Sequence, residues 1–209
     1  MKGCIALYRQ LFAGLAYLHG IDVVHADLKP GNICVNEYKE LTIIDFGLAW
    51  VDRPFHRPRC EWEFDIKRIG QIPMQTLPYR APEVCFSDPH CGKPMDVWSV
   101  GCIVLEVWVL RPVVRHDVKS AAAVIATHVT LRPLQGPALD YYMRLQSFSD
   151  KMLCKSMPKT LAQMFERNSV PPGLADLVCG MLEFHPKQRL KASDLRVRLA
   201  SLESGGLAV

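Results

Sequence analysis

Residues 95–110 form the most apolar segment of the chain, and this segment constrains the fold more than any other feature. Its apolar side chains cover nearly the whole circumference of a helix, which is the pattern of a buried helix. The stretch from Val97 to Leu110 carries Ser99 and Glu106 and is shorter than the ~18 apolar residues that a membrane span needs. The segment therefore predicts a central helix that other elements surround, and no membrane partner is expected.

The composition predicts one folded globular domain rather than a disordered chain. Of 209 residues, 49% are hydrophobic and 22% are charged, and the formal net charge is only +4. This weak positive charge, without basic runs interleaved with aromatic residues, argues against a nucleic-acid partner. Eight scattered cysteines include no CxxC pair, and no secretory signal opens the chain. We therefore expect reduced thiols and a cytoplasmic or nuclear location.

The patterning predicts an α+β chain that is mainly α. Helical spacing over residues 4–19 is followed by two short strands, 33–36 and 41–44, which form a hairpin around a polar turn. Prolines interrupt residues 50–94, which are expected to be mostly loop. The remaining helices are expected at residues 117–130, 138–147, 159–167, 174–184 and 192–203. The chain lacks βαβ alternation, which argues against a doubly wound nucleotide-binding fold.

The loop after the first helix concentrates the chemistry. Asp27, Lys29 and Asn32 place a carboxylate, an amine and a carboxamide within six residues, and the hairpin returns a further carboxylate, Asp45. Carboxylate and amide oxygens suit Mg²⁺, which is usually held by one or two protein carboxylates together with substrate phosphates. An ammonium group balances a phosphoryl group, and a second aspartate can accept a hydroxyl proton. The set therefore predicts a site for a metal–polyphosphate complex.

These residues also carry a family resemblance. His25 to Asn32 reads HADLKPGN, and with Asp45-Phe46-Gly47 it resembles the catalytic-loop and metal-binding signature of eukaryotic protein kinases. Residues 81–83 resemble the box that closes the kinase activation segment. Three further expectations follow from the resemblance: a kinase domain over residues 1–203 with its activation segment at 45–83, a short tail at 204–209, and the large helical lobe of the kinase fold without the small N-terminal lobe.

The resemblance implies a role for each matching residue. Asp27 would orient or deprotonate a protein hydroxyl, and Lys29 would contact the phosphate transferred from ATP. Asn32 and Asp45 would hold Mg²⁺, and Cys34 would lie beneath adenine. The implied substrate is a protein, and Thr76 would lie at the substrate-binding end of the activation segment. The remaining residues have implied structural roles, with Glu83 and Arg189 as a buried pair: His25, Phe46, Gly47, Glu83, Asp96 and Arg189.

Two groups of enzymes share parts of this pattern. Small-molecule phosphotransferases use HxDxxxGN, which residues 25–32 also resemble, but they lack the segment that ends in Ala81-Pro82-Glu83. Lys29 and Thr76 resemble the Ser/Thr-specific pattern of protein kinases. Tyr79-Arg80 resembles the cyclin-dependent-kinase-like group, although Pro78 replaces its usual tryptophan. The resemblance therefore favours a Ser/Thr protein kinase, with that group as the expected subgroup.

The chain lacks the parts of a kinase that cover ATP. No GxGxxG occurs, and no lysine sits in a VAIK-like strand. Three interpretations stay open: a truncated gene model of a full kinase, a short protein with an interaction or scaffold role, and an enzyme completed by a small lobe on another chain. The function expected from the resemblance is ATP-dependent phosphorylation of Ser or Thr, and its alternative is an inactive interaction module.

Ala26 departs from the family pattern, in which this position usually carries an arginine that pairs with a phosphorylated residue. Between Phe46 and Gln75 the chain has no Ser, Thr or Tyr. The phosphate and its receptor are thus both absent. The sequence predicts an activation segment whose order depends on contacts other than a phosphate.

Overall fold

The computed structural model describes residues 2–52, 74–86, 88, 91–117, 119–120, 124–125, 135–144 and 160–204. Within these ranges the chain is mostly helical, with a few short strands, as predicted. Its longer helices are α1 (Lys2–Gly20), α4 (Lys93–Val109), α6 (Gly136–Met143), α7 (Leu161–Arg167), α8 (Pro172–Met181) and α9 (Ala192–Ser204). No helix of this described part is long and apolar enough to cross a membrane.

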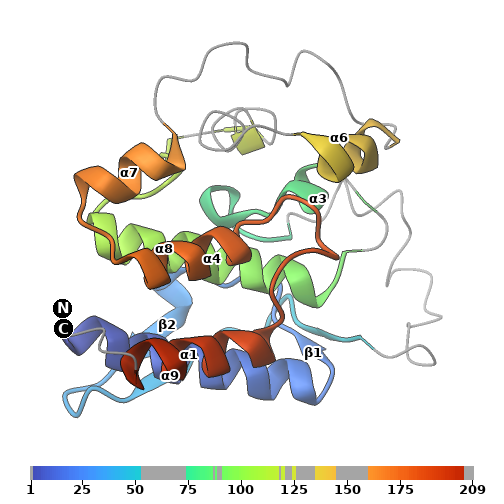
Figure 1. Ribbon diagram of the computed structural model, residues 1–209. Helices are drawn as coiled ribbons and strands as arrows, with labels where there is room; N and C mark the ends of the chain where they lie inside the picture. The colour runs from blue at the N-terminus through green and yellow to red at the C-terminus, as the bar shows by residue number, and fades with distance from the viewer. Residues whose placement is uncertain are drawn as a thin grey trace.

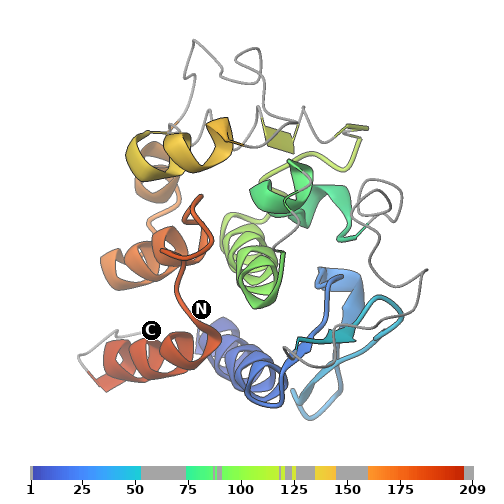
Figure 2. The ribbon, with the colours of Figure 1, turned by 90° about the vertical axis from the view of Figure 1, so that its right-hand side faces the viewer.

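Helix α4 is the centre of the core, as its all-round apolar pattern predicts. Its buried residues run from Met95 to Leu105 without a break. Helix α8 packs against α4, while α1 and α9 lie side by side along another edge of the domain (Figures 1 and 2). Gly101 permits the close approach of α4 to α8, because a Cβ there would lie 2.9 Å from Leu182 Cδ2 and from Met181 Cβ.

The predicted hairpin is present. Strands β2 (Ile33–Val35) and β3 (Leu41–Ile43) pair antiparallel, with Ile33 opposite Ile43. Gln10 of α1 donates to Lys39 O (2.9 Å) and accepts from Leu41 N (2.8 Å), so the hairpin is tied to the first helix. This contact fixes where the loops before and after the hairpin lie.

A second antiparallel pair was not predicted. Strand β1 (Val23–Val24) pairs with β4 (Trp50–Val51), so the expectation of loop from residue 50 is wrong at its start. Helix α3 (Pro82–Cys85) and the 3-10 turns η1 (Pro30–Asn32) and η2 (Leu77–Tyr79) add further short elements. Two-residue strands carry no period that a sequence can reveal. Their pairing nevertheless brings the loop after β1 beside the loop before β4.

Two predicted helix boundaries shift for identifiable reasons, and one predicted helix does not begin where expected. Helix α7 begins at Leu161 rather than 159, because Thr160 caps it in a reciprocal bond with Gln163. Helix α8 ends at Met181 rather than 184, since Leu190 N donates to Gly180 O (3.1 Å), the carbonyl that the backbone nitrogen of residue 184 would bind in a longer helix. Residue 117 lies in a turn and residues 119–120 are not helical, so no helix begins at 117. Most of the expected helix 117–130 lies outside the described residues.

Candidate active site

Asp96 anchors the loop of residues 25–32 to the core. It lies in the first turn of α4, is fully buried, and accepts hydrogen bonds from the backbone nitrogens of His25 (2.8 Å) and Ala26 (2.9 Å). His19 Nε2 lies 3.1 Å from the same carboxylate. Ala26 has a left-handed backbone (φ 64°), a strained conformation that such anchoring stabilises. The two amide bonds fix the point from which Asp27 projects.

Asp27 is the centre of a compact polar cluster. Its Oδ1 accepts from both the backbone nitrogen (2.9 Å) and the Oγ1 (2.8 Å) of Thr76. Its Oδ2 accepts from Lys29 Nζ (2.7 Å) and Asn32 Nδ2 (3.3 Å). Lys29 Nζ also donates to Thr76 Oγ1 at 3.1 Å. The structure therefore brings together four residues that sequence reasoning selected, from two segments almost fifty positions apart.

The surroundings of Asp27 favour its ionised form. Burial by itself would raise the pKa of Asp27, but the hydrogen bonds from Lys29 and Thr76 and the charge of Lys29 together hold this pKa below its usual range. A carboxylate with a low pKa is a weak base, so it binds and orients a hydroxyl group better than it removes the proton beforehand. Thr76 Oγ1 shows that Asp27 Oδ1 can accept a bond from a hydroxyl group.

Asn32 and Asp45 are brought near each other by the hairpin. Ile44 N donates to Asn32 O (2.9 Å), and Asp45 follows directly with an exposed side chain and a left-handed backbone (φ 64°). Asn32 Nδ2 donates to Asp27 O (2.9 Å). The amide oxygen of Asn32 is therefore the side-chain atom that could bind a metal ion. Gly47 N donates to Asp45 Oδ1 at 3.3 Å, and a Cβ on Gly47 would lie 3.2 Å from that oxygen.

This donor set fits Mg²⁺ held largely by a substrate. One carboxylate and one amide oxygen are hard ligands of the kind Mg²⁺ takes. Among the residues that the structure describes, no group of three or more His, Cys, Asp or Glu side chains is placed to hold a metal ion. An ion at Asn32 and Asp45 would thus need further oxygens, such as those of phosphates.

His25 connects the loop of residues 25–32 with the loop after the hairpin. Its Nε2 lies 3.0 Å from Ile44 O, and its Nδ1 accepts from Asp27 N at 3.2 Å, which assigns the ring proton to Nε2. The Phe46 ring lies 4.9 Å from the His25 ring, between centroids. Phe46 nevertheless remains 46% exposed, and Cys34 on β2 is also exposed.

Glu83 and Arg189 meet in the core. Arg189 donates to both carboxylate oxygens of Glu83, at 2.6 and 2.9 Å, and both side chains are buried. Glu83 lies in α3, and Arg189 precedes α9. The pair therefore fixes the end of the segment that carries Thr76 onto the helical core.

A family model described as protein kinase domain matches residues 2–197. The chain belongs to the protein kinase family. As a kinase domain it is 35% identical over 192 residues to human mitogen-activated protein kinase 13. It is 34% identical over 189 residues to mitogen-activated protein kinase spm1 of Schizosaccharomyces pombe, and 32% identical over 193 residues to mitogen-activated protein kinase p38a of Drosophila melanogaster.

These matches cover most of the kinase domain described here but only part of each relative. They include 90%, 88% and 90% of this chain, but 47%, 42% and 47% of the respective relatives. The chain thus spans about half the length of the relatives it matches. The activity of a whole kinase is therefore a proposal for this chain.

Sequence reasoning missed two polar residues with partners inside the kinase domain: His19 is half-buried and Gln75 is buried. His19, the last but one residue of α1, contacts Asp96, and Gln75 lies beside Thr76 with 1% of its surface exposed. Neither stands in a motif that predicts burial. His19 lies at a helix end, where a surface histidine is the ordinary interpretation, and Gln75 follows a proline-rich stretch.

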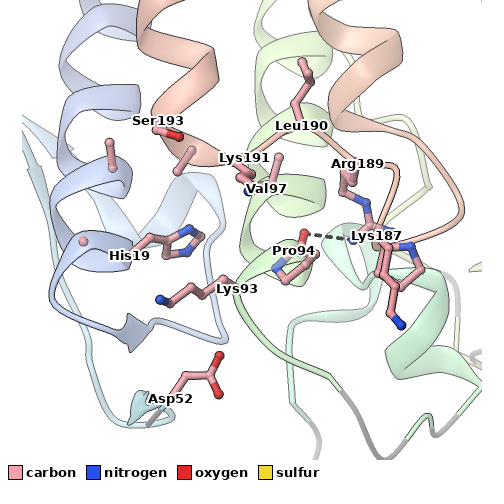
Figure 3. Close-up of a pocket in the computed structure, with 14 residues that line it drawn as sticks. His19, Asp52, Lys93, Pro94, Val97, Lys187, Arg189, Leu190, Lys191 and Ser193 are labelled. Atoms are coloured by element: carbon pink, nitrogen blue, oxygen red, sulfur yellow. Dashed lines mark hydrogen bonds between the residues drawn. The ribbon is translucent and has the colours of Figure 1, made fainter. Parts of the chain in front are cut away.

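A cavity of about 610 Å³ lies among α1, α4 and the loop before α9 of the kinase domain. His19, Lys93 and Arg189 contribute to its wall, which is formed by the end of α1, the start of α4 and the loop before α9 (Figure 3). Asp27 and Asp45 do not line this cavity. It is therefore separate from the cluster around Asp27.

Proposed function

We propose that this chain supplies the catalytic and protein-binding half of a Ser/Thr protein kinase that transfers a phosphoryl group from ATP to a protein hydroxyl. The observation that carries the proposal is the Asp27 carboxylate, which already accepts a hydroxyl bond from Thr76 and is flanked by the Lys29 ammonium group. Membership of the protein kinase family and similarity to mitogen-activated protein kinases support it.

Each side chain has a proposed task. Asp27 binds and orients the substrate hydroxyl, and Lys29 moves its ammonium group to the transferred phosphate. Asn32 and Asp45 hold Mg²⁺ by their side-chain oxygens, and Cys34 lies beneath adenine. When bound, Mg²⁺ neutralises phosphate charge and positions the phosphates. The chain's own residues thereby bring a hydroxyl group and a phosphoryl group to the same carboxylate.

The proposed enzyme needs a cover for the ATP phosphates. The chain has no GxGxxG sequence, which in kinases covers these phosphates. We propose that a small lobe, from a longer form of the protein or from a partner chain, supplies it. The cyclin-dependent-kinase-like subgroup and a cytoplasmic or nuclear location are parts of the same proposal. Reduced thiols at Cys4, Cys34, Cys85, Cys91 and Cys102 support the location.

Radiolabelled ATP provides the test. The 209-residue chain and the longest form of the protein that the gene encodes are each incubated with Mg-ATP and a mixture of protein substrates. We expect label on Ser or Thr with the longer form, and loss of this transfer in Asp27→Asn. The matched control is Asp117→Asn, which removes an exposed carboxylate that pairs with Arg115. Equal transfer by wild type and Asp27→Asn would contradict the proposal.

A second function is favoured by one observation. Val35 and Phe46 are 47% and 46% exposed, and Tyr38 and Ile44 nearby are exposed as well. Exposed apolar side chains near one another tend to bind a protein partner. The alternative is therefore an inactive kinase-like lobe that acts as an interaction or scaffold module. Absence of phosphoryl transfer in the longer form, with stable binding of a partner that Val35→Asp abolishes, would favour this alternative.

A further inference from the structure

Gln75 carries a buried amide whose polar atoms are all engaged. Its Nε2 donates to Met95 O (2.8 Å) and to Ser99 Oγ (2.6 Å), and its Oε1 accepts from Ala81 N at 2.9 Å. Met95 and Ser99 belong to α4, while Ala81 caps α3. A buried amide without partners is unfavourable, so this complete set of bonds indicates a position shaped for glutamine.

The backbone of Gln75 joins two further segments. Its nitrogen donates to Ala26 O at 2.9 Å, and its carbonyl oxygen accepts from Arg80 Nε (3.1 Å) and Nη2 (2.8 Å). Its φ of 57° is left-handed, which is unfavourable for a residue with a Cβ and is sustained only where neighbours fix it. One residue thus connects the catalytic loop, the end of the activation segment and the central helix.

The consequence reaches the catalytic carboxylate through the next residue. Thr76 follows Gln75 and makes two hydrogen bonds to Asp27 Oδ1, through its backbone nitrogen and its Oγ1. The two bonds can form only if the backbone turn at Gln75 directs Thr76 toward Asp27. Because side-chain and backbone bonds fix Gln75 from three sides, the position of Thr76 against Asp27 is determined by Gln75.

None of these contacts needs a phosphate. The groups that bind the Gln75 side chain are uncharged, and Ala26 offers only its backbone carbonyl to the network. Residues 47–74 contain no Ser, Thr or Tyr that could be phosphorylated. A hydrogen-bonded amide therefore stands where charge pairing with a phosphate would otherwise be needed to order this end of the segment.

We propose that Gln75 is a positioning residue that holds Thr76 against Asp27, so that the order of residues 74–81 is independent of phosphorylation. The importance of this order for phosphoryl transfer rests on the proposed function, in which Asp27 binds the substrate hydroxyl. The order itself is a property of the fold and can be measured without any kinase activity.

Hydrogen exchange followed by mass spectrometry tests the proposal on the full 209-residue chain. Gln75→Met keeps the volume and removes the amide. Ser99→Ala keeps α4 but removes one partner of that amide together with the Ser99 Oγ bond to Tyr79 O (2.8 Å), so its effect on Gln75 is read at residues 75 and 76. The matched control is Gln10→Met, because the Gln10 amide makes two comparable bonds to backbone atoms of Lys39 and Leu41. Wild-type chain is also compared before and after phosphatase treatment.

We expect Gln75→Met to accelerate exchange in residues 74–81 by about tenfold or more, with a smaller effect in Ser99→Ala. Exchange in α8 should stay unchanged, Gln10→Met should accelerate exchange only around residues 39–41, and phosphatase should change nothing. If Gln75→Met accelerated exchange equally in α8, Gln75 would contribute only to the general stability of the core, and the proposal would be overturned. Faster exchange of residues 74–81 after phosphatase treatment would overturn it as well. If Gln75→Met does not fold, Ser99→Ala decides by the same criteria.

Discussion

Arg189 and Glu83, 106 positions apart, form an ion pair in which every N–H of the guanidinium group has an acceptor. Two bonds reach the Glu83 carboxylate at 2.6 and 2.9 Å. The other three reach the backbone oxygens of residues 94, 183 and 184. Burial by itself would lower the pKa of Arg189, but the Glu83 carboxylate outweighs it and raises the pKa above its usual value. Arg189 therefore stays charged inside the core.

Breaking this pair should be costly. We expect Arg189→Met to lower the free energy of unfolding by about 3–5 kcal/mol, because it leaves the Glu83 carboxylate buried and unpaired. The measurement is equilibrium unfolding in urea. Arg115→Met is the matched control, since Arg115 pairs with Asp117 in solvent and its loss should leave the urea midpoint unchanged. A loss below about 1 kcal/mol in Arg189→Met would contradict the prediction.

Gly101 should not tolerate even a methyl group. A helical Gly→Ala substitution ordinarily stabilises by about 1 kcal/mol. In Gly101→Ala we expect the opposite sign, a loss of about 1–3 kcal/mol, because the new Cβ would lie 2.9 Å from atoms of Met181 and Leu182. Gly20→Ala at the end of α1 is the control, since a Cβ there meets nothing within 4 Å. Urea unfolding that ranked both variants alike would refute the prediction.

The parts of this fold that the sequence predicted are those with local signals. The all-round apolar pattern of residues 95–110 identified α4, and alternation around a polar turn identified the hairpin of β2 and β3. The short pair of β1 and β4 was missed because two residues carry no periodicity. The end of α8 was placed too late because Leu190, eight residues beyond Leu182, donates its backbone N–H to the Gly180 carbonyl that would continue the helix.

The candidate site also combines contacts that could be predicted from the sequence with contacts that could not. Asp27, Lys29 and Asn32 lie within six residues, so their proximity could be expected from the chain alone. The contact of Thr76 with Asp27 depends on how the chain turns at Gln75. The left-handed backbone of Gln75 could not be predicted from its residue type. Polar residues such as Gln75 and His19 look like surface residues in a sequence. Only tertiary packing reveals the partners that permit the burial of Gln75 and the partial burial of His19.

Cys34 should be the described thiol that reacts first, and Mg-ATP should protect it. Cys34 is exposed, whereas burial raises the pKa of the Cys85 thiol to about 12 and so suppresses its reactive thiolate. We expect a maleimide at neutral pH to label Cys34 first, and excess Mg-ATP to slow this several-fold, if adenine lies over Cys34. Mass spectrometry after digestion measures both rates.

The background for the Cys34 experiment carries Cys60→Ser and Cys154→Ser, so that only described thiols are compared. Cys4 on α1 is the internal control, because nucleotide bound near Cys34 should leave the labelling rate of Cys4 unchanged. Equal slowing at both cysteines, or none at Cys34, would remove the support for adenine at this position.

Asp27 should make stability depend on pH in acid. Because its folded pKa lies below the unfolded value, the ionised carboxylate stabilises the fold above the unfolded pKa of about 4, and this contribution is lost as pH falls through the folded pKa. Wild type should therefore lose more stability on acidification than Asp27→Asn. Lys29→Met should weaken this pH dependence, since Lys29 makes the strongest bond that lowers the pKa. Parallel pH profiles of wild type and Asp27→Asn in urea unfolding would contradict the assignment.

The apolar residues exposed around the hairpin should promote self-association without contributing to stability. Val35 is 47% exposed and Ile44 37%, so Val35→Thr with Ile44→Thr removes apolar surface that already faces water. We expect the double variant to bind less of a dye for apolar surfaces and to scatter less light as concentration rises, with a stability change within about 0.5 kcal/mol. The buried control is Val104→Thr, where a hydroxyl group enters the core and should cost about 1–3 kcal/mol. Unchanged scattering in the double variant would show that these side chains do not drive association.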